Sequence, residues 1–316
     1  MKVLIQNYAT PNSTEPLYIN ETINAIDGSE STLWAKSDVS AFDMFDIVHP
    51  DMFISHFGTL GNDSVKYLSS NKKISLILNV TGAQQEHIDM LNDMIPSKNI
   101  NCPFIFTNNP TRLIHLISKK IKLVSIMSGA DTFMGGQNIV STDYDIDTGI
   151  ITDYAIRDLK EIDSLTKGSD TYHVLTHDES LMSEPESKID FAAPVMRMYS
   201  LYNKYKKMVV SHDDAYLSQS FFDSIMYGNE TYYHSKQTSH HDKMDDVIKS
   251  FFPLSESLMW NGEEDRASQQ SAKQHLLRKH TCLSRVQRLF YMLKCRDVEN
   301  KIETLIQRNY NDHSSS

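Results

Sequence analysis

A polar stretch between two apolar runs carries the residue types best suited to binding an anion. The first run ends at Ser211, helical spacing begins near Ser218, and Gly228 ends that helix before the next apolar run. The first turn of a helix offers backbone N–H groups that have no partner within the helix and that attract anions. The side chains of Ser218, Gln219 and Ser220 add further donors. The sequence therefore predicts an exposed turn that can bind a diphosphate.

Two carboxylates accompany this turn. Asp223 lies about one and a half turns into the helix, where it can accept hydrogen bonds from the hydroxyls of a ribose. Asp214 lies in the loop before the helix. Both carboxylates fit a nucleotide whose diphosphate occupies the turn. The alternative is an ordinary amphipathic crossover helix that ends at a glycine.

A reaction at such a site also needs a group that accepts a proton, and two residues elsewhere are the main candidates. His56 ends the run Phe53-Ile-Ser, and Asp131 ends the segment Ser128-Gly-Ala. Asp43 and Asp46 are weaker candidates. Each main candidate has a structural alternative, namely a histidine that is hydrogen-bonded at a strand end and an aspartate that caps a turn.

Short apolar runs alternate with segments of helical spacing over the first part of the chain. This alternation predicts right-handed βαβ units and a parallel sheet that is covered on both faces. The expected strands are Lys2 to Tyr8, Ser31 to Trp34, Asp51 to Phe57, Ile74 to Val80, Pro103 to Thr107 and Ile121 to Met127. The expected helices are Leu17 to Ile26, Ser64 to Ser70, Gln84 to Ile95 and Thr111 to Lys120.

A turn-rich stretch up to Gly149 is typical of a connection between domains, and a second series follows it. Its expected strands are Ile150 to Ile156, Tyr172 to Leu175, Lys207 to Ser211 and Glu230 to His234. Its expected helices are Asp158 to Leu165, Phe191 to Tyr205 and Ser218 to Tyr227. Residues 236–272 lack a clear pattern. Two helices, Leu276 to Leu293 and Val298 to Arg308, close the chain before a tail from His313 that we expect to be disordered.

We therefore expect an α/β protein of two tandem Rossmann-like domains, residues 1–135 and 150–275, with C-terminal helices over residues 276–309 that pack across the cleft. Ligands of parallel α/β sheets bind outside the carboxyl ends of the strands. The active site should accordingly lie between the two domains.

Composition excludes several classes of protein. With 316 residues, 40% apolar and 23% charged, the chain can fill a core, and no apolar run approaches the length of a membrane helix or a signal peptide. Three widely spaced cysteines argue against a disulfide framework and for a cytoplasmic location. The chain also lacks the glycine-rich dinucleotide motif, the Walker motif and the serine nucleophile elbow, which argues against the usual dehydrogenases, P-loop enzymes and esterases.

Charge is distributed unevenly. The net charge is −10, from 31 basic and 41 acidic residues. Residues 273–308 hold nine Lys or Arg and three Asp or Glu, a balance of +6 that leaves −16 for the rest of the chain. This basic island is either a solvated helix surface or a surface that faces phosphate groups.

Two acidic clusters raise the question of a metal site. Asp143, Asp145 and Asp147 alternate as in a calcium loop, but Thr148 and Tyr154 stand where an EF-hand has Gly and Glu. The same aspartates could form the Asp-x-Asp clamp of single-domain sugar transferases, although a second strand–helix series follows them. The run 240–246 is rich in His and Asp and is more typical of a polar loop. We therefore expect no obligatory metal.

Three segments resemble those of two-Rossmann (GT-B) glycosyltransferases. Asp223 and Gly228 reproduce the acidic residue that opens the donor-binding helix and the glycine five residues later, although Ala215 replaces the family's earlier glutamate. The segment Lys279-His-Thr-Cys-Leu-Ser-Arg285 is similar to the His-Thr-x-x-x-Arg segment of bacterial and phage members. Ser128-Gly-Ala-Asp131 is similar to the hinge at which such enzymes leave their first domain.

The resemblance implies transfer of a sugar from a nucleotide donor, a uridine diphosphate sugar, to a hydroxyl acceptor. It assigns the acceptor to the N-terminal domain and the nucleotide to the second domain, where helix amides and basic side chains such as Arg285 and Lys279 stabilise the departing diphosphate. The phage-like composition suggests hydroxymethylcytosine in DNA as an acceptor, with glucose or arabinose as the sugar. Overall acidity favours a glycan, a protein or a small molecule instead. A two-domain protein that binds a nucleotide or a sugar without turnover is the alternative from another class.

Overall fold

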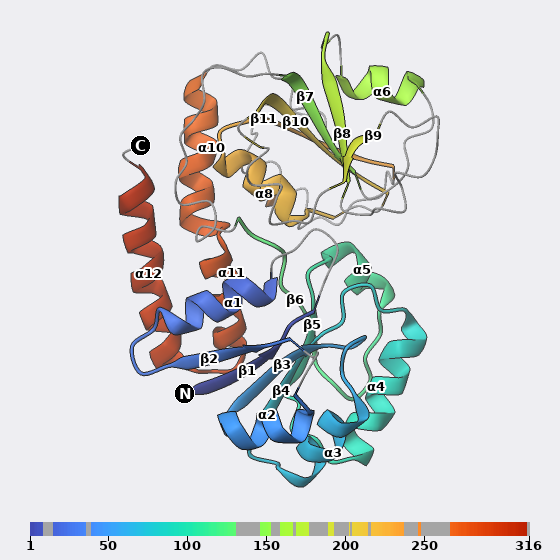
Figure 1. Ribbon diagram of the computed structural model, residues 1–316, viewed down its shortest axis with the longest axis vertical. Helices are drawn as coiled ribbons and strands as arrows, with labels where there is room; N and C mark the ends of the chain where they lie inside the picture. The colour runs from blue at the N-terminus through green and yellow to red at the C-terminus, as the bar shows by residue number, and fades with distance from the viewer. Residues whose placement is uncertain are drawn as a thin grey trace. The chain divides into compact units, whose positions relative to one another are not determined.

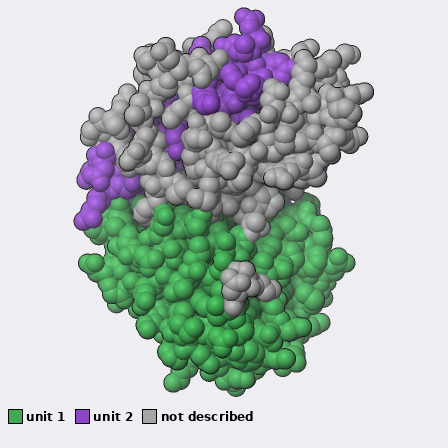
Figure 2. All heavy atoms as spheres, viewed as in Figure 1, with its two compact units in different colours: residues 1–10, 15–127, 282–305 green, residues 11–14, 128–281, 306–316 purple. Residues whose placement is uncertain are grey.

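The computed structural model describes residues 1–8, 15–35, 39–130, 146–152, 159–166, 169–176, 189–192, 202, 204–213, 216–236, 246–247 and 266–314. The chain divides into two compact units (Figure 2). Unit 1 comprises Met1–Thr10, Glu15–Met127 and Cys282–Leu305. Unit 2 comprises Pro11–Thr14, Ser128–Thr281 and Ile306–Ser316. The chain thus passes from unit 1 to unit 2 after Met127 and returns after Thr281.

A six-stranded parallel sheet forms the centre of unit 1, in the order β2-β1-β3-β4-β5-β6 (Figure 1). Its strands are β1 (Lys2–Gln6), β2 (Glu30–Trp34), β3 (Met52–His56), β4 (Ser75–Asn79), β5 (Phe104–Thr107) and β6 (Leu123–Ser125). Most of their residues are buried, as expected of parallel strands that are covered on both faces. The predicted parallel sheet is confirmed.

Helices cover both faces of this sheet. One face packs its apolar residues, among them Leu4, Phe53 and Leu78, against three helices: α2 (Ala41–Val48), α3 (Asn62–Ser70) and α4 (Gln85–Ser97). The other face meets α1 (Glu15–Asn24) and α11 (Cys282–Met292), which contact each other. A C-terminal helix therefore completes the core of the N-terminal unit.

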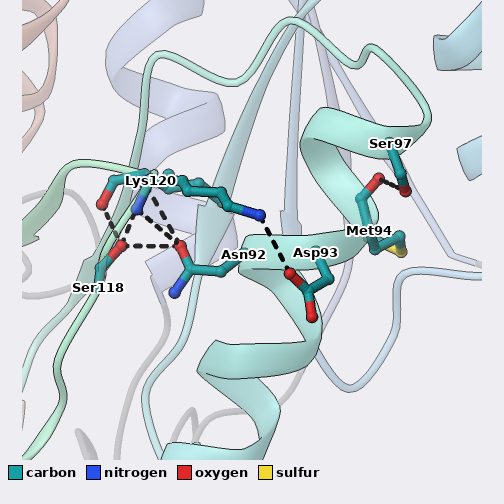
Figure 3. A network of polar contacts seen from close by, with 7 residues as sticks. Asn92, Asp93, Met94, Ser97, Ser118 and Lys120 are labelled. Carbon is teal, nitrogen blue, oxygen red and sulfur yellow. Dashed lines mark hydrogen bonds and ion pairs between the residues drawn. The ribbon is translucent and has the colours of Figure 1, made fainter.

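The helix between β5 and β6 is shorter than the sequence predicts. Helix α5 spans Pro110–His115, whereas helical spacing predicts a helix to Lys120. The reason is Asn92 of α4, whose Oδ1 accepts hydrogen bonds from the Ser118 hydroxyl (3.0 Å) and from the backbone N–H groups of Lys120 and Ile121 (both 3.3 Å) (Figure 3). The Lys120 ammonium also pairs with Asp93 at 3.2 Å. These contacts hold the segment in a non-helical form that leads into β6.

Unit 2 contains a five-stranded parallel sheet in the order β11-β10-β7-β8-β9. Its strands are β7 (Ile146–Thr152), β8 (Tyr172–Thr176), β9 (Ile189–Ala192), β10 (Tyr205–His212) and β11 (Glu230–Ser235). The predicted helix Phe191 to Tyr205 is wrong at both ends, because β9 extends to Ala192 and β10 begins at Tyr205. Two parallel sheets in sequence confirm the expected pair of Rossmann-like halves.

The helices of unit 2 also lie on both faces of its sheet. Helices α8 (Gln219–Met226) and α10 (Arg266–Lys279) pack with Val210 and Tyr233 of the sheet. Helix α6 (Leu159–Thr166) contributes Leu165 to a second cluster, with Ile150, Val174 and Val209. The start of α10 lies in the part of the sequence that showed no clear pattern.

The C-terminal region differs from the prediction in two ways. The single helix expected from Leu276 to Leu293 is divided, because α10 ends at Lys279 and α11 begins at Cys282. The last helix, α12, spans Arg296–Ser314, so His313 and Ser314 belong to a helix and not to a disordered tail. No helix among the described residues is long and apolar enough to cross a membrane.

The break between α10 and α11 coincides with a pairing of two distant chain segments. Ala130 forms a parallel bridge with Thr281, and its N–H donates to the carbonyl of His280 at 2.9 Å. A Cβ atom on Gly129 would lie 2.7 Å from the carbonyl carbon and oxygen of Thr281. The two segments next to the unit boundaries can therefore approach this closely only because residue 129 is glycine.

Candidate functional site

Each sheet has one topological switch point, at which successive strands stop being added on one side of the first strand and are added on the other side. In unit 1, β2 lies on one side of β1 and β3 lies on the other. In unit 2, β8 lies on one side of β7 and β10 lies on the other. Open α/β sheets bind ligands outside the carboxyl ends of their strands at such points. We therefore take the carboxyl edge at β1/β3 as the candidate site of unit 1 and the carboxyl edge at β7/β10 as the candidate site of unit 2.

Polar groups gather at the β1/β3 edge. The Ser55 hydroxyl donates to Gln6 Oε1 at 2.6 Å, and Gln6 Nε2 donates to the carbonyl of Thr59 at 3.1 Å. The ring of Tyr8, which lies just beyond β1, stacks on the ring of His56, the last residue of β3, with centroids 5.5 Å apart. Gln6 and Ser55 are fully buried, so each polar atom needs a partner and the network fixes the geometry of the edge.

Glu15, in the first turn of α1, is the buried carboxylate of this edge, with 2% of its surface exposed. It accepts a hydrogen bond from the Tyr8 hydroxyl, and Asn79 Nδ2 at the end of β4 donates to the same Oε1 at 2.6 Å. Tyr18 also hydrogen-bonds to it. Burial raises the pKa of the Glu15 carboxyl, while these hydrogen bonds act in the opposite direction.

His56, a predicted catalytic base, lies at the end of β3 with both ring nitrogens engaged. Its Nε2 lies 2.9 Å from the carbonyl oxygen of Thr81, and the N–H of Gly58 donates to its Nδ1 at 3.2 Å. These two contacts define a neutral ring with the proton on Nε2. Burial lowers the pKa of His56, which favours the same neutral form. Acting as a base would require the ring to give up the Gly58 hydrogen bond.

The weaker candidates Asp43 and Asp46 both lie on α2 and have local partners. The Ser40 hydroxyl donates to the Asp43 carboxylate at 2.6 Å and accepts from its backbone N–H, which caps the helix. Asp46 accepts a hydrogen bond from the Tyr67 hydroxyl at 2.7 Å. These contacts account for both carboxylates as structural groups.

Arg285, which the sequence analysis assigned to the diphosphate, lies on α11 in unit 1. It lines a small cavity, about the size of one water molecule, together with Glu15, Tyr18, Ile19 and Phe106, and with residues 126, 286 and 289. Burial lowers the pKa of Arg285 to about 10, and Tyr18 acts against this shift. The structure thus brings Arg285 together with Glu15, while the other predicted donor ligands belong to unit 2.

In unit 2, the predicted helix start follows β10 directly. Ser218 is the N-cap residue of α8, and its hydroxyl lies 2.9 Å from His212 Nε2. His212 is the last residue of β10, and its ring stacks on that of Tyr216 with centroids 4.3 Å apart. Thr152 is the last residue of β7, the strand next to β10, and is fully buried. The helix start therefore lies at the expected edge of the sheet.

The predicted exposure of this turn is wrong. Ser218, Gln219 and Ser220 expose only 1%, 1% and 3% of their surfaces. Helix α8 is enclosed because its apolar residues pack with Val210 of β10 and Leu276 of α10. A turn that is enclosed in protein still attracts an anion, because its N–H groups act more strongly where water is excluded.

Asp223, the predicted ribose ligand, is also buried, with 2% of its surface exposed. Its negative charge adds to burial in raising the pKa of the Tyr202 hydroxyl, so the two side chains lie near each other. Tyr202 also stacks on Tyr227, with ring centroids 5.1 Å apart. Asn229 secures this region, because its Nδ2 donates to the carbonyls of Tyr202 (2.9 Å) and Tyr205 (2.6 Å). Asp223 is therefore a buried carboxylate beside Tyr202.

Two predicted residues and most of the proposed metal ligands lie outside the described residues, namely Asp131, Asp214, Asp143, Asp145 and the run 240–245. Asp147 is described and lies at the amino end of β7, where it accepts hydrogen bonds from Thr171. That position is the wrong end of the strand for an Asp-x-Asp clamp. Within the described ranges, no group of three His, Cys, Asp or Glu is arranged to hold a metal ion.

Sequence reasoning missed four polar residues at the two edges: Tyr8, Glu15, Asn79 and His212. Each comes directly at or after the carboxyl end of a predicted strand, or in the first turn of the helix that follows. A polar residue at such a position is a signal in its own right, because parallel strands bring their carboxyl ends to a common edge. Only the strand order shows which of these residues meet.

No protein-family model and no curated protein sequence matches the chain. Among solved structures, an α-glucosyltransferase (AGT) in complex with UDP matches with a TM-score of 0.54 and 8% identity, over 89% of this chain and 96% of that one. Sucrose-phosphate synthase from Thermosynechococcus elongatus matches with a TM-score of 0.49 and 6% identity, over 93% and 98%. UDP-GlcNAc 2-epimerase from Neisseria meningitidis bound to UDP-GlcNAc matches with 0.46 and 11%, over 93% and 99%.

The first of these similarities supports the fold over nearly the whole of both chains. Together with the two parallel sheets in sequence, it confirms that the fold is that of GT-B glycosyltransferases.

Proposed function

We propose that the protein is a glycosyltransferase that moves a sugar from a nucleotide donor, a UDP-sugar, to a hydroxyl acceptor. The proposal assigns the nucleotide to unit 2 and the acceptor to unit 1. It is supported by the GT-B fold and by polar groups at the ligand-binding edge of each sheet. Fold alone does not fix chemistry, so the side chains at those edges must determine which ligands bind.

The main support for the proposal is that α8 begins at the carboxyl edge of the sheet at β7/β10. A helix that begins at this edge directs its first N–H groups outward from the carboxyl ends of the strands, which suits the two phosphates of a nucleoside diphosphate. Ser218 and Gln219 add side-chain donors, and Asp223 supplies a carboxylate for the ribose. Charge that develops on the departing diphosphate is then stabilised by groups already in place.

We propose hydroxymethylcytosine in DNA as the acceptor, with glucose or arabinose as the sugar. The supporting observation is the exposure of the basic island. Seven of its nine cationic side chains are exposed: Arg278, Lys279, Arg288, Lys294, Arg296, Lys301 and Arg308. Exposed cations on a chain of net charge −10 can neutralise DNA phosphates locally. Base chemistry in duplex DNA also requires the base to leave the stack.

The first experiment separates transfer from simple binding. The full chain is incubated with UDP-glucose and hydroxymethylcytosine DNA, and free UDP is measured over time. We expect UDP release that depends on the acceptor. A glycan, protein or small-molecule acceptor would give release only in its own presence, and a binding protein without turnover would bind UDP-glucose and release none under any of these conditions.

The second experiment tests the donor half. Asp223→Asn keeps the size of the side chain and removes its charge, so we expect UDP affinity to fall about 10-fold or more, equivalent to one charge-assisted hydrogen bond of roughly 1.5–3 kcal/mol. Asp147→Asn is the matched control, because Asp147 lies at the opposite edge of the same sheet. Equal UDP affinity of both variants and the unmodified chain would remove Asp223 from the site.

A further inference from the structure

We propose that the amino edge of the unit 1 sheet at β4, β5 and β6 binds the phosphate backbone of double-stranded DNA. This surface lies at the opposite end of the strands from the candidate site of unit 1, so the inference goes beyond the proposed function. The sequence analysis found only the C-terminal basic island, because the lysines of this surface are dispersed over three separate connections.

Strand order brings these three connections together. Strands β4, β5 and β6 are parallel neighbours, so the segments that lead into them meet at one edge of the sheet. Each of the three segments carries lysine. All six lysines are exposed, and we call them the lysine edge: Lys72, Lys73, Lys98, Lys119, Lys120 and Lys122.

Hydrogen bonds continue before the strands begin and hold the connections side by side. The N–H of Leu76 donates to the carbonyl of Asn101 at 2.8 Å, and the N–H of Ile105 donates to the carbonyl of Lys122 at 2.9 Å. The side chain of Asn101 also donates from Nδ2 to the hydroxyl of Ser75 at 3.1 Å. The spacing of the three connections is therefore that of the strands themselves.

Few carboxylates offset the charge of the lysine edge. Residues 94–130 contain no Asp or Glu. Asp93 of α4 pairs with Lys120 at 3.2 Å (Figure 3), and Asp51, just before β3, accepts a hydrogen bond from the N–H of Lys2 at 2.8 Å. Within the described part of the chain, the other five lysines of the edge form no ion pair. The edge is therefore strongly positive on a chain whose net charge is −10.

The distribution of this charge fits an extended polyanion. Neighbouring strands lie about 4.8 Å apart, so three strands span about 10 Å. Duplex DNA carries one phosphate charge per about 1.7 Å of its axis, which gives about six charges over the same length. Lysine side chains along such an edge neutralise phosphates without reading the base sequence.

The apolar residues of the same connections favour DNA over a lipid surface. Ile74, Ile100 and Ile121 lie next to or near the lysines and are buried. Ile117 is the large apolar side chain of these connections that is exposed, at 63%. A segment that lies in a membrane surface inserts a whole apolar face besides its basic residues. A single isoleucine beside six lysines supplies little of that contact.

The test measures binding of the full chain to a fluorescent duplex of about 30 base pairs by anisotropy, at salt concentrations from about 50 to 200 mM. The duplex contains unmodified cytosine, and no nucleotide sugar is present. Two double variants of the lysine edge are compared with a control that removes the same charge from unit 2: Lys72→Gln/Lys73→Gln, Lys119→Gln/Lys122→Gln and the control Lys204→Gln/Lys206→Gln.

Each lysine-edge variant should bind the duplex at least about 10-fold more weakly at the lowest salt concentration. The slope of log affinity against log salt should become shallower by about 2, since each phosphate contact contributes about 0.9. The control should stay within about 2-fold in affinity and about 0.5 in slope. Circular dichroism of all variants verifies that these exposed substitutions leave the fold intact.

Acetylation of lysines with and without the duplex provides a second readout. Bound DNA should lower the acetylation of the lysine edge at least about 3-fold and leave Lys204 and Lys206 unchanged, as measured by peptide mass spectrometry.

Equal salt slopes for the lysine-edge variants and the control, or unchanged acetylation of the lysine edge, would overturn the proposal. Binding to phosphatidylserine vesicles that is weakened by Ile117→Ser, without any loss of DNA binding in the lysine-edge variants, would assign the surface to membranes instead. These results do not depend on sugar transfer, because neither donor nor hydroxymethylcytosine is present. Absence of UDP release with every acceptor would overturn the proposed function and leave the lysine edge as a DNA-binding surface.

Discussion

Replacement of Gly129 by alanine tests the pairing of the two segments next to the unit boundaries. A Cβ atom at this position would lie 2.7 Å from the carbonyl carbon and oxygen of Thr281 and 2.9 Å from the carbonyl oxygen of His280. All three contacts are with backbone, so no side-chain rotation can relieve them. The segments must separate, and the hydrogen bond from Ala130 N–H to His280 O at 2.9 Å is strained or lost.

The magnitude follows from these two effects. Overpacking against fixed atoms costs about 1–3 kcal/mol, and a lost backbone hydrogen bond costs about 1 kcal/mol more. A total of about 3 kcal/mol corresponds to a decrease in Tm of roughly 6–12 °C for a unit of this size. The assay is thermal unfolding followed by circular dichroism.

The matched control is Gly82→Ala. Gly82 has a φ of +82°, and a Cβ atom there would meet nothing within 4 Å. It should therefore cost only the backbone strain of about 1–2 kcal/mol. A Gly129→Ala variant that melts within 2 °C of the unmodified chain, or above the Gly82→Ala variant, would refute the close pairing.

Three further predictions concern pH, a buried amide and the cysteines. Burial lowers the pKa of His56 in the folded state, so unfolding takes up a proton as the pH falls below about 6.5. The free energy of unfolding should therefore decrease between pH 7.5 and pH 5, and it should decrease less in the His56→Gln variant. Urea titrations at the two pH values measure this difference. The Asn229→Ala variant should lose about 2–4 kcal/mol of unfolding free energy in the same titrations, because two buried carbonyls lose their donor. A loss of less than about 1 kcal/mol would contradict the role of Asn229 as that donor. Brief alkylation at pH 8 should label Cys295 first, since Cys282 is fully buried and burial raises the pKa of Cys102 to about 12. Peptide mass spectrometry identifies the labelled cysteine, and modification of Cys102 before Cys295 would contradict this order.

The parallel sheet of unit 1 could be predicted because its strands are short continuous apolar runs. The segments Ile74 to Val80 and Pro103 to Thr107 carry this pattern, and β4 and β5 lie within them. Helix α2 was not among the expected helices, because Ala41–Val48 is short and its apolar residues fit either a strand or a helix. Local periodicity therefore sufficed where the sheet buries both faces of a strand.

Errors arose where distant residues determine the backbone. Helical spacing continues through Leu276 to Leu293, yet the helix breaks at Thr281 because that residue pairs with Ala130, far away in sequence. The expected helix Thr111 to Lys120 stops early because Asn92 of another helix binds the following segment. Neither partner can be identified from the local sequence.

The candidate site was predictable in part for the same reason. The start of α8 could be located from its own sequence, since the apolar run, the N-cap Ser218 and the terminal Gly228 are local signals. Its burial could not, because it depends on packing with α10. Glu15 was missed because only the order of the strands shows that its carboxylate meets Tyr8 and Asn79.

The mass of the acceptor after reaction tests sugar transfer most directly. Hydroxymethylcytosine DNA is treated with the full chain and UDP-glucose, digested to nucleosides and measured by mass spectrometry. If the protein transfers glucose, we expect a nucleoside that is heavier by one hexose residue, formed together with an equal amount of UDP. Unmodified nucleosides without UDP, across UDP-sugars and with glycan and small-molecule acceptors in parallel, would contradict sugar transfer by this protein.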